Sequence, residues 1–365
     1  MAVNFIFPSH LLDESLDVRI KYFQEKTIKH QIQSACLDKA LREIFNPKGA
    51  QIVFIFGPSG VGKTTIVPKI EQGIAERASE RMLNDSSFIP YLSVEAKSPE
   101  DGLFDWGDFY TRALKAGEEP LHDQKVRPLG YMEGDKHVRR VRKRRKMAKS
   151  DGRSALEDWL QQRRPLALII DEAQHLKKIN GMKTLINQMD TLKSLANMSK
   201  TKIVLIGTYE SLDLLKLSGQ LTRRTREIHF PRYRWDIKED RMEFARIVKS
   251  FQKNMPLVKE PNLVDYLDLL YKHSVGCIGI LKDWLDRSLE LCFEDDKQSI
   301  TKAMLEKTKT DRKSLFRLAQ ELTEGEQYYE TMEEEIDLGA TLGMDVEIPK
   351  KEKKSGKSNK THSLL

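Results

Sequence analysis

Several features that would indicate a membrane protein, a secreted scaffold or a zinc protein are missing from this sequence. Its 365 residues include only three cysteines, and neither their odd number nor their spacing suits a disulfide framework or a zinc site. No apolar run approaches the length of a membrane span. The opening residues, MAVNFIFPSH, lack the charged start and continuous apolar core of a signal peptide. We therefore expect a cytoplasmic protein with reduced thiols and no membrane contact.

Histidine is also sparse, which limits the kinds of metal site that the chain could form. The eight histidines form no H-E-x-x-H or other ligand spacing, which argues against a metal site other than one for Mg²⁺. His175 ends the sequence DEAQH, as in the DEAx-box helicases. A helicase of that class needs a second nucleotide fold, and too little chain follows to form one.

Charge is plentiful, and its sign alternates in blocks although the net charge is only +7. Residues 125–149 contain eleven Lys or Arg against two acidic residues, residues 321–347 contain ten acidic residues and no basic one, and six Lys follow from Lys350 onward. Blocks of this kind favour charged partners and charged tails over a uniformly basic surface.

One stretch, IVFIFGPSGVGKTT, carries the strongest signal for function. The apolar run Ile52–Phe56 predicts a short buried strand, and Gly57–Thr64 matches the phosphate-loop pattern G-x-x-x-x-G-K-[ST]. Glycines let backbone N–H groups curl around phosphate oxygens, and a helix that follows points its positive end at the same anion. The pattern predicts binding of ATP and Mg²⁺ by Gly57, Pro58, Ser59, Gly60, Val61, Gly62, Lys63, Thr64 and Thr65. Lys63 is expected to reach the β- and γ-phosphates, and Thr64 to hold Mg²⁺.

Two later strands end in residues that suit hydrolysis. The apolar run before Asp171 and Glu172 predicts a buried strand, with Asp171 as the carboxylate on the Mg²⁺ side and Glu172 positioned to polarise water. Thr208 follows the apolar run KIVLIG and is expected to contact the γ-phosphate or the water. The alternatives are an acidic helix cap at Asp171 and an ordinary turn at Thr208.

Arginines precede the last predicted strand. Hydrolysis needs positive charge against the transferring phosphoryl group, and a neighbouring subunit often supplies it. We therefore expect Arg223 or Arg224, or else Arg226, to act on a second copy of the chain, which makes the protein an oligomer when active. A solvated or DNA-facing basic turn is the alternative.

The order of the elements predicts an α/β fold with a helical appendage. Strands and helices alternate from Ile52 to Phe230, which favours a three-layer sandwich with a mostly parallel sheet. Helical patterns cover Asp13–Phe45 and four segments after Trp235, which are Asp236–Gln252, Asn262–His273, Gly276–Phe293 and Ile300–Leu322. We expect an N-terminal helical extension (1–50), a nucleotide-binding domain (51–235) with a basic insertion (117–151) lacking regular structure, a helical domain (236–325) and a disordered acidic and basic tail (326–365).

The basic insertion is dense enough to contact the phosphates of nucleic acid. Its cluster comprises Arg139, Arg140, Arg142, Lys143, Arg144, Arg145 and Lys146, and such contacts give salt-sensitive binding without sequence preference. A solvated insertion or a docking site for an acidic partner is the alternative.

Taken together, the motifs resemble the TnsC/TniB family of AAA+ ATPases that regulate bacterial DNA transposition. The resemblance extends over roughly Ile28–Phe293 and rests on GPSGVGKTT, DEAQHL, VLIGT with ESLDLL, QLTRRTREIHFPRY and, most specifically, SVEAKSPEDGLFDWGDFYTRAL. It implies an AAA+ P-loop NTPase with a helical lid, in the bacterial cytoplasm.

The resemblance also implies a biological role. In that family, ATP-bound subunits form rings or helical filaments on double-stranded DNA, mark a target, recruit the transposase and disassemble on hydrolysis. A target-selection protein, in some systems a CRISPR effector, acts with them. DNA contacts come from loops of the α/β domain, for which Lys97 and Arg112 are the candidates here.

One position departs from the AAA+ pattern. Those proteins usually carry an arginine in a G-x-x-R motif of the lid that touches the γ-phosphate, whereas Gly276-Cys277-Ile278-Gly279 ends in glycine. Either Lys282 substitutes for the arginine or the contact is absent.

Two other functions remain open from the sequence. One is an AAA+ ATPase of the replication-initiator or helicase-loader type, although no helix-turn-helix pattern follows Phe293. The other is an ATP-dependent protein-interaction switch that does not bind DNA, in which the basic insertion binds an acidic protein.

Overall fold

The computed structural model describes residues 7–98, 103–119, 131–133, 136–138, 149–178, 182–216 and 224–334. By its contacts the chain forms two compact units, residues 1–325 and 326–365. The nucleotide fold and the lid helices over residues 238–308 all belong to the first. No helix within the described ranges is long and apolar enough to cross a membrane.

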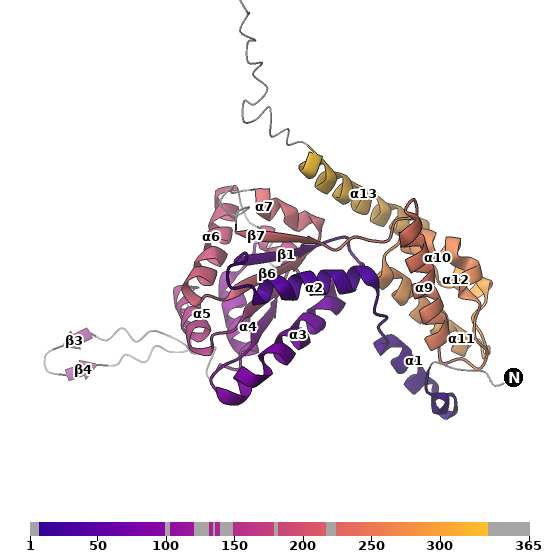
Figure 1. Ribbon diagram of the computed structural model, residues 1–365, viewed down its shortest axis with the longest axis horizontal. Coiled ribbons are helices and arrows are strands. Elements are labelled where there is room, and N and C mark those ends of the chain that lie inside the picture. Colours follow the sequence, from indigo (N-terminus) through magenta and orange to yellow (C-terminus); the bar gives the residue numbers. More distant parts are fainter. Residues whose placement is uncertain are drawn as a thin grey trace, which may run out of the picture. The chain divides into compact units, whose positions relative to one another are not determined.

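A five-stranded parallel sheet lies at the centre of the nucleotide fold (Figure 1). Its order is β2-β5-β6-β1-β7, with bounds β1 (Ile52–Phe56), β2 (Tyr91–Glu95), β5 (Ala167–Asp171), β6 (Lys202–Gly207) and β7 (Thr225–His229). All five residues of β1 are buried, as expected for a parallel strand that is covered on both faces. The predicted α/β sandwich with a mostly parallel sheet is confirmed.

Helices cover both faces of this sheet. On one face, α2 (Gln31–Phe45) and α3 (Lys63–Asn84) bury a cluster that alternates along the strands and includes Val53, Ile55 and Ile169. The intervening residues of the strands face α4 (Trp106–Ala116), α5 (Lys149–Arg163) and α6 (Met182–Ser199), which contact one another and the sheet. The predicted helix over Met182–Met198 is therefore present as α6.

The basic insertion contains a small hairpin that the sequence did not predict. Strands β3 (Tyr131–Glu133) and β4 (Lys136–Val138) pair antiparallel with Tyr131 opposite Val138. Strands of three residues are too short for an alternating pattern to emerge. The cluster from Arg139 to Lys146 lies outside the described residues.

The lid is helical, as predicted, with one boundary in a different place. It comprises α9 (Lys238–Asn254), η4 (Leu263–Tyr266), α10 (Leu267–Ser274), α11 (Ile278–Glu294) and α12 (Lys302–Thr308), followed by α13 (Arg312–Glu334). The predicted single helix over Ile300–Leu322 is wrong, because α12 ends at Thr308 and a separate helix begins after Asp311. The Asp311 side chain accepts hydrogen bonds from the backbone N–H groups of Lys313 (2.9 Å) and Ser314 (3.0 Å), which starts a new helix.

The N-terminal segment divides between the lid and the sheet. A short 3₁₀ turn, η1 (Ser9–Asp13), precedes α1 (Leu16–Glu25), and residues 26–30 separate α1 from α2, where the sequence predicted one helical stretch. Phe23 of α1 is fully buried in the lid core and packs edge-on against Phe251, whereas α2 packs on the sheet. His30, just before α2, forms a 2.9 Å hydrogen bond with the hydroxyl of Tyr233, which lies in the connection from β7 to the lid.

Candidate nucleotide site

The phosphate loop follows β1 and leads directly into α3. Gly60 (φ +74°) and Gly62 (φ +109°) adopt left-handed conformations that other residues rarely reach, and Gly62 caps α3. Gly57 is required for another reason, since a Cβ there would lie 2.1 Å from the Phe230 carbonyl oxygen. Each predicted loop glycine therefore has a steric or conformational cause.

Lys63 is buried inside the loop. Its ammonium donates to the carbonyl oxygens of Gly57 (2.9 Å) and Pro58 (2.7 Å). Burial lowers the pKa of Lys63 to about 8, while the carboxylates of Glu172 and Asp171 act in the opposite direction. A phosphate oxygen would bind this ammonium more strongly than neutral carbonyls do, because both partners would be charged.

The next two threonines differ in their surroundings. Thr64 is exposed at the start of α3, where a hydroxyl can reach a metal ion bound to phosphate. The Thr65 hydroxyl donates to the Gly62 carbonyl (2.7 Å) and accepts from the Gln33 amide (3.0 Å). Gln33 in turn accepts from Lys69, so a polar chain joins α2 to the first turn of α3.

The parallel register brings the acidic pair to the same edge of the sheet as the loop. Asp171 ends β5, and the intervening strand β6 ends at Gly207, which lies opposite Phe56 of β1. Burial raises the pKa of Asp171, and the neighbouring carboxylates Glu172 and Glu95 act in the same direction. A divalent cation would relieve this accumulation of negative charge.

Glu172 is held in an unusual position by a residue that the sequence did not single out. Its backbone is left-handed (φ +56°), and its side chain accepts a hydrogen bond from the amide of Gln174, in the 3₁₀ turn η2 (Ala173–Lys177). The side-chain amide oxygen of Gln174 accepts from the backbone N–H of Thr208 (3.2 Å). Gln174 therefore links the acidic pair to the end of β6.

Thr208 lies at that end, before the turn η3 (Tyr209–Leu212) and the short helix α7 (Asp213–Lys216). Its side-chain hydroxyl is buried and has no hydrogen-bond partner among the described residues. An unpaired buried hydroxyl is costly and indicates a partner that the protein itself does not supply. With Lys63, Thr64 and Asp171 close by along the same edge, this donor set fits a nucleoside triphosphate with Mg²⁺.

Comparison with known proteins agrees with this geometry. Residues 46–215 match a family model described as an AAA domain. The chain has an AAA+ P-loop fold.

Two solved structures share the fold at low sequence identity. The Aeropyrum pernix ORC2 protein, solved as ADPNP–ADP complexes, aligns with a TM-score of 0.53 and 13% identity over 80% of this chain and 72% of that one. Cdc6p from Pyrobaculum aerophilum aligns with a TM-score of 0.51 and 12% identity over 79% of this chain and 69% of that one. No curated protein sequence matches the chain. At such identities the likeness establishes the fold and not the function.

The lid of this AAA+ fold touches the phosphate loop through its backbone. The Ile280 N–H donates to the Gly60 carbonyl (3.3 Å), and a Cβ on Gly279 would lie 2.5 Å from the same oxygen. The position where AAA+ proteins usually carry arginine therefore has no room for a side chain. The suggestion that Lys282 substitutes is wrong, because its ammonium binds Asp286 and lies over the Phe23 ring, 4.5 Å from its centroid.

The predicted arginines lie at the other edge of the AAA+ sheet. Thr225 pairs with Ile52, so Arg224 precedes the amino end of β7, about 16 Å along the strands from the phosphate loop. Arg224 is exposed, with one guanidinium nitrogen 3.4 Å from the Gln51 amide oxygen. Arg226 pairs with Glu43 at 3.2 Å. Arg223 lies outside the described residues. Within one chain, therefore, Arg224 does not meet Asp171 and Glu172.

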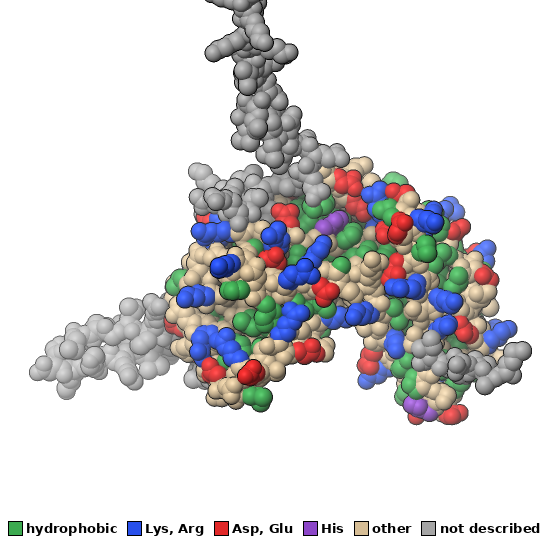
Figure 2. Space-filling model, in the orientation of Figure 1, with side chains coloured by type: hydrophobic (Ala, Val, Ile, Leu, Met, Phe, Trp, Pro, Cys, Tyr) green, Lys and Arg blue, Asp and Glu red, His purple; other side chains and the backbone are tan. Residues whose placement is uncertain are grey.

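Two of the residues predicted to contact DNA, Lys97 and Arg112, lie within the described ranges. Lys97 is exposed one residue after Ala96, whose N–H donates to the Asp171 carbonyl at 2.8 Å. Arg112, on α4, forms an ion pair with Asp108 at 3.0 Å. Arg139, Arg140, Arg142, Lys143, Arg144 and Arg145 fall outside the described ranges. On the face drawn in Figure 2, basic side chains are interspersed with acidic ones over the described surface.

Proposed function

We propose that this protein is an ATP-hydrolysing AAA+ regulator of bacterial DNA transposition. It assembles on duplex DNA as a ring or helical filament, marks the target site, recruits the transposase with a target-selection protein, and disassembles on hydrolysis. One observation carries the assembly step. The phosphate loop and the acids Asp171 and Glu172 lie at one edge of the sheet, whereas Arg224 lies exposed at the other. The motif resemblance, above all in residues 93–114, supplies the transposition role.

The chemistry follows from the residues at the loop edge. Lys63 would bind the β- and γ-phosphates, and Thr64 and Asp171 would hold Mg²⁺, which when bound would supply positive charge against the phosphates. Glu172 polarises the attacking water as general base. The side-chain amide nitrogen of Gln174 orients the Glu172 carboxylate, and its side-chain oxygen fixes the backbone N–H of Thr208. The Thr208 hydroxyl then contacts the γ-phosphate or the water.

DNA binding rests on positive charge after β2, on α4 and in the basic insertion. Lys97, Arg112 and the cluster from Arg139 to Lys146 provide phosphate contacts without base recognition. Neutralising residues 139–146 should weaken duplex binding and reduce the slope of log K against log salt by about one unit for each phosphate that the variant no longer neutralises. An unchanged slope would reassign the insertion to a protein partner.

A second candidate is an AAA+ ATPase of the replication-initiator or helicase-loader type. The shared fold with ORC2 and Cdc6p favours it, and ORC2 was solved with ADPNP and ADP. The DNA-independent interaction switch is the third candidate.

Electron microscopy and sedimentation with ATP, with and without duplex DNA, distinguish these functions. A regular oligomer that requires both ATP and duplex, and then binds the transposase, supports the proposal. An ordered oligomer that instead binds a replicative helicase supports the loader. If ATP and duplex together give no ordered oligomer, the proposal fails and the interaction switch remains.

A further inference from the structure

Helix α13 covers the phosphate loop from the side. A small gap of about 10 Å³ lies between them, lined by Pro58, Ser59, Thr208 and Tyr209 on the nucleotide fold and by Leu318, Glu321 and Leu322 on α13. A cavity of that size is at the lower limit for a single water molecule, so the two surfaces are closely packed. Gly325 permits the approach, because a Cβ there would lie 2.4 Å from the Tyr209 ring.

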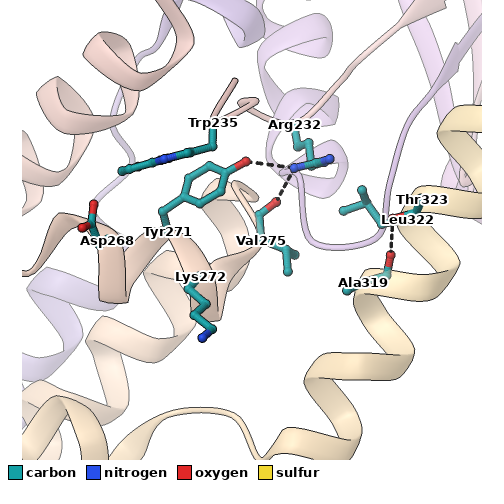
Figure 3. A pocket seen from close by; sticks show the side chains of 9 residues that line it. All are labelled: Arg232, Trp235, Asp268, Tyr271, Lys272, Val275, Ala319, Leu322 and Thr323. Carbon is teal, nitrogen blue, oxygen red and sulfur yellow. Dashed lines mark hydrogen bonds between the residues drawn. The ribbon is translucent and has the colours of Figure 1, made fainter. Parts of the chain in front are cut away.

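The adjacent face of α13, which shares Leu322 with the first, is loosely packed. A cavity of about 440 Å³ separates Ala319, Leu322 and Thr323 of α13 from Trp235 and Tyr271, whose rings lie 4.7 Å apart (Figure 3). Side chains that border a void lose the dispersion contacts they would make in a filled core. Residues 318–325 of α13 therefore pack more closely against the phosphate loop than against Trp235 and Tyr271.

The contact between α13 and the phosphate loop places a carboxylate beside the loop. The Glu321 carboxylate lies 3.5 Å from the Ser59 hydroxyl. Lys63 donates to the carbonyls of Gly57 and Pro58, so the γ-phosphate end of the loop borders the residues that α13 covers. Two negative groups this close repel each other, and Glu321 is exposed at the rim, so the repulsion is partly screened by solvent.

We propose that α13 is a cover of the phosphate loop that the γ-phosphate displaces, and that the surface it vacates receives a second copy of the chain. The second copy brings its exposed Arg224 edge to the surface formed by Pro58, Ser59, Thr208 and Tyr209, next to the negative γ-phosphate. This inference rests on the proposed function, because it assigns the regulation of the same shared site. ADP, which lacks the γ-phosphate, leaves α13 in place.

The test uses the full chain without DNA, a non-hydrolysable ATP analogue, and ADP. Glu321→Gln removes the repulsion, and Gly325→Leu pushes α13 off by steric overlap with Tyr209 while keeping a good helix former. Glu324→Gln is the matched control, since Glu324 is exposed on the same helix and bonds Gln320. Nucleotide affinity, amide hydrogen exchange over residues 312–325 and sedimentation are measured.

We expect the analogue to raise hydrogen exchange in α13 of the wild type, and ADP not to do so. Glu321→Gln should bind the analogue about fivefold more tightly, at the lower end of couplings between linked sites, with ADP affinity unchanged. Gly325→Leu should raise exchange without nucleotide and lower the concentration for self-association with the analogue about fivefold.

The inference is overturned if the analogue binds without changing exchange in α13, or if Glu321→Gln behaves like Glu324→Gln. Because DNA is absent, either result leaves duplex-dependent assembly untouched. A chain that shows the expected exchange but forms no oligomer on duplex would instead contradict the proposed function. Loss of all nucleotide binding by the wild type would remove the site on which both depend.

Discussion

The two edges of the central sheet differ in composition although the same five strands form both. The carboxyl edge collects a buried lysine held by backbone carbonyls, two carboxylates, and a threonine hydroxyl with no hydrogen-bond partner among the described residues. The amino edge carries Arg224 and Arg226 exposed to solvent. A reaction site built at one edge of a parallel sheet is ordinary for α/β folds. Because the two edges lie at opposite ends of the same strands, Arg224 can meet an acidic pair only on another copy of the chain.

The largest effect should come from removing the positive charge inside the loop. Lys63→Ala should weaken ATP binding about 1,000-fold, because hydrogen bonds to charged groups contribute about 1.5–3 kcal/mol each and Lys63 reaches two phosphates. Nucleotide-dependent assembly should be lost with it. Calorimetry and sedimentation measure the two effects, and assembly that survives without nucleotide binding would contradict the proposed coupling.

The acidic half of the same edge can be tested without disturbing binding. Glu172→Gln should leave ATP affinity within about twofold and reduce turnover about 1,000-fold, within the range for loss of a general base. Phosphate release and nucleotide affinity are measured on the same preparation. Unchanged phosphate release would exclude Glu172 from the chemistry.

The amino edge is tested by mixing two inactive variants. Arg224→Ala should reduce turnover about 100-fold, less than a complete arginine finger contributes, because Arg223 is adjacent. Mixing it with Glu172→Gln should restore phosphate release. At some interfaces the intact Arg224 of one variant then faces the intact Glu172 of the other. Arg226→Ala is the control, because Arg226 pairs with Glu43 of its own chain. A mixture no more active than the average of its components would rule out a shared site.

A smaller effect on ATP affinity is expected from a change in pH. A phosphate favours the protonated form of Lys63, whose pKa is about 8 in the free protein. ATP affinity should therefore be full below pH 8 and fall towards tenfold per unit above it, until the higher pKa of the complex is reached. Lys282→Arg should give the same profile, since Lys282 faces Asp286 and not the loop. A flat wild-type profile between pH 7 and 9 would contradict the buried position of Lys63.

Much of the carboxyl edge could be predicted because its signals are local. The phosphate loop is recognisable from the glycines of one short segment, and Asp171 and Thr208 follow apolar runs that could only be buried strands. Since parallel strands end at one edge, the sequence alone placed the loop, Asp171 and Thr208 together.

The residues that escaped prediction depend on contacts distant in sequence or on fine backbone geometry. Gln174 gains its position from a left-handed Glu172 and from the end of β6, neither of which has a sequence pattern. The absence of an arginine at Gly279 was visible, but its cause, the Gly60 carbonyl, was not. An amphipathic pattern in α1 likewise does not say which apolar surface it covers, and that surface is the lid.

The division of the N-terminal segment has a mechanical consequence. The lid is joined to the sheet by the chain after β7 and, through α1, by residues 26–30, and the two connections meet where His30 bonds Tyr233. Because the lid is attached by two connections that contact each other, its movement relative to the sheet is restricted. A nucleotide that shifts Gly60 would therefore act on the lid through the hydrogen bond from the Ile280 N–H, while His30 and Tyr233 keep the two connections together.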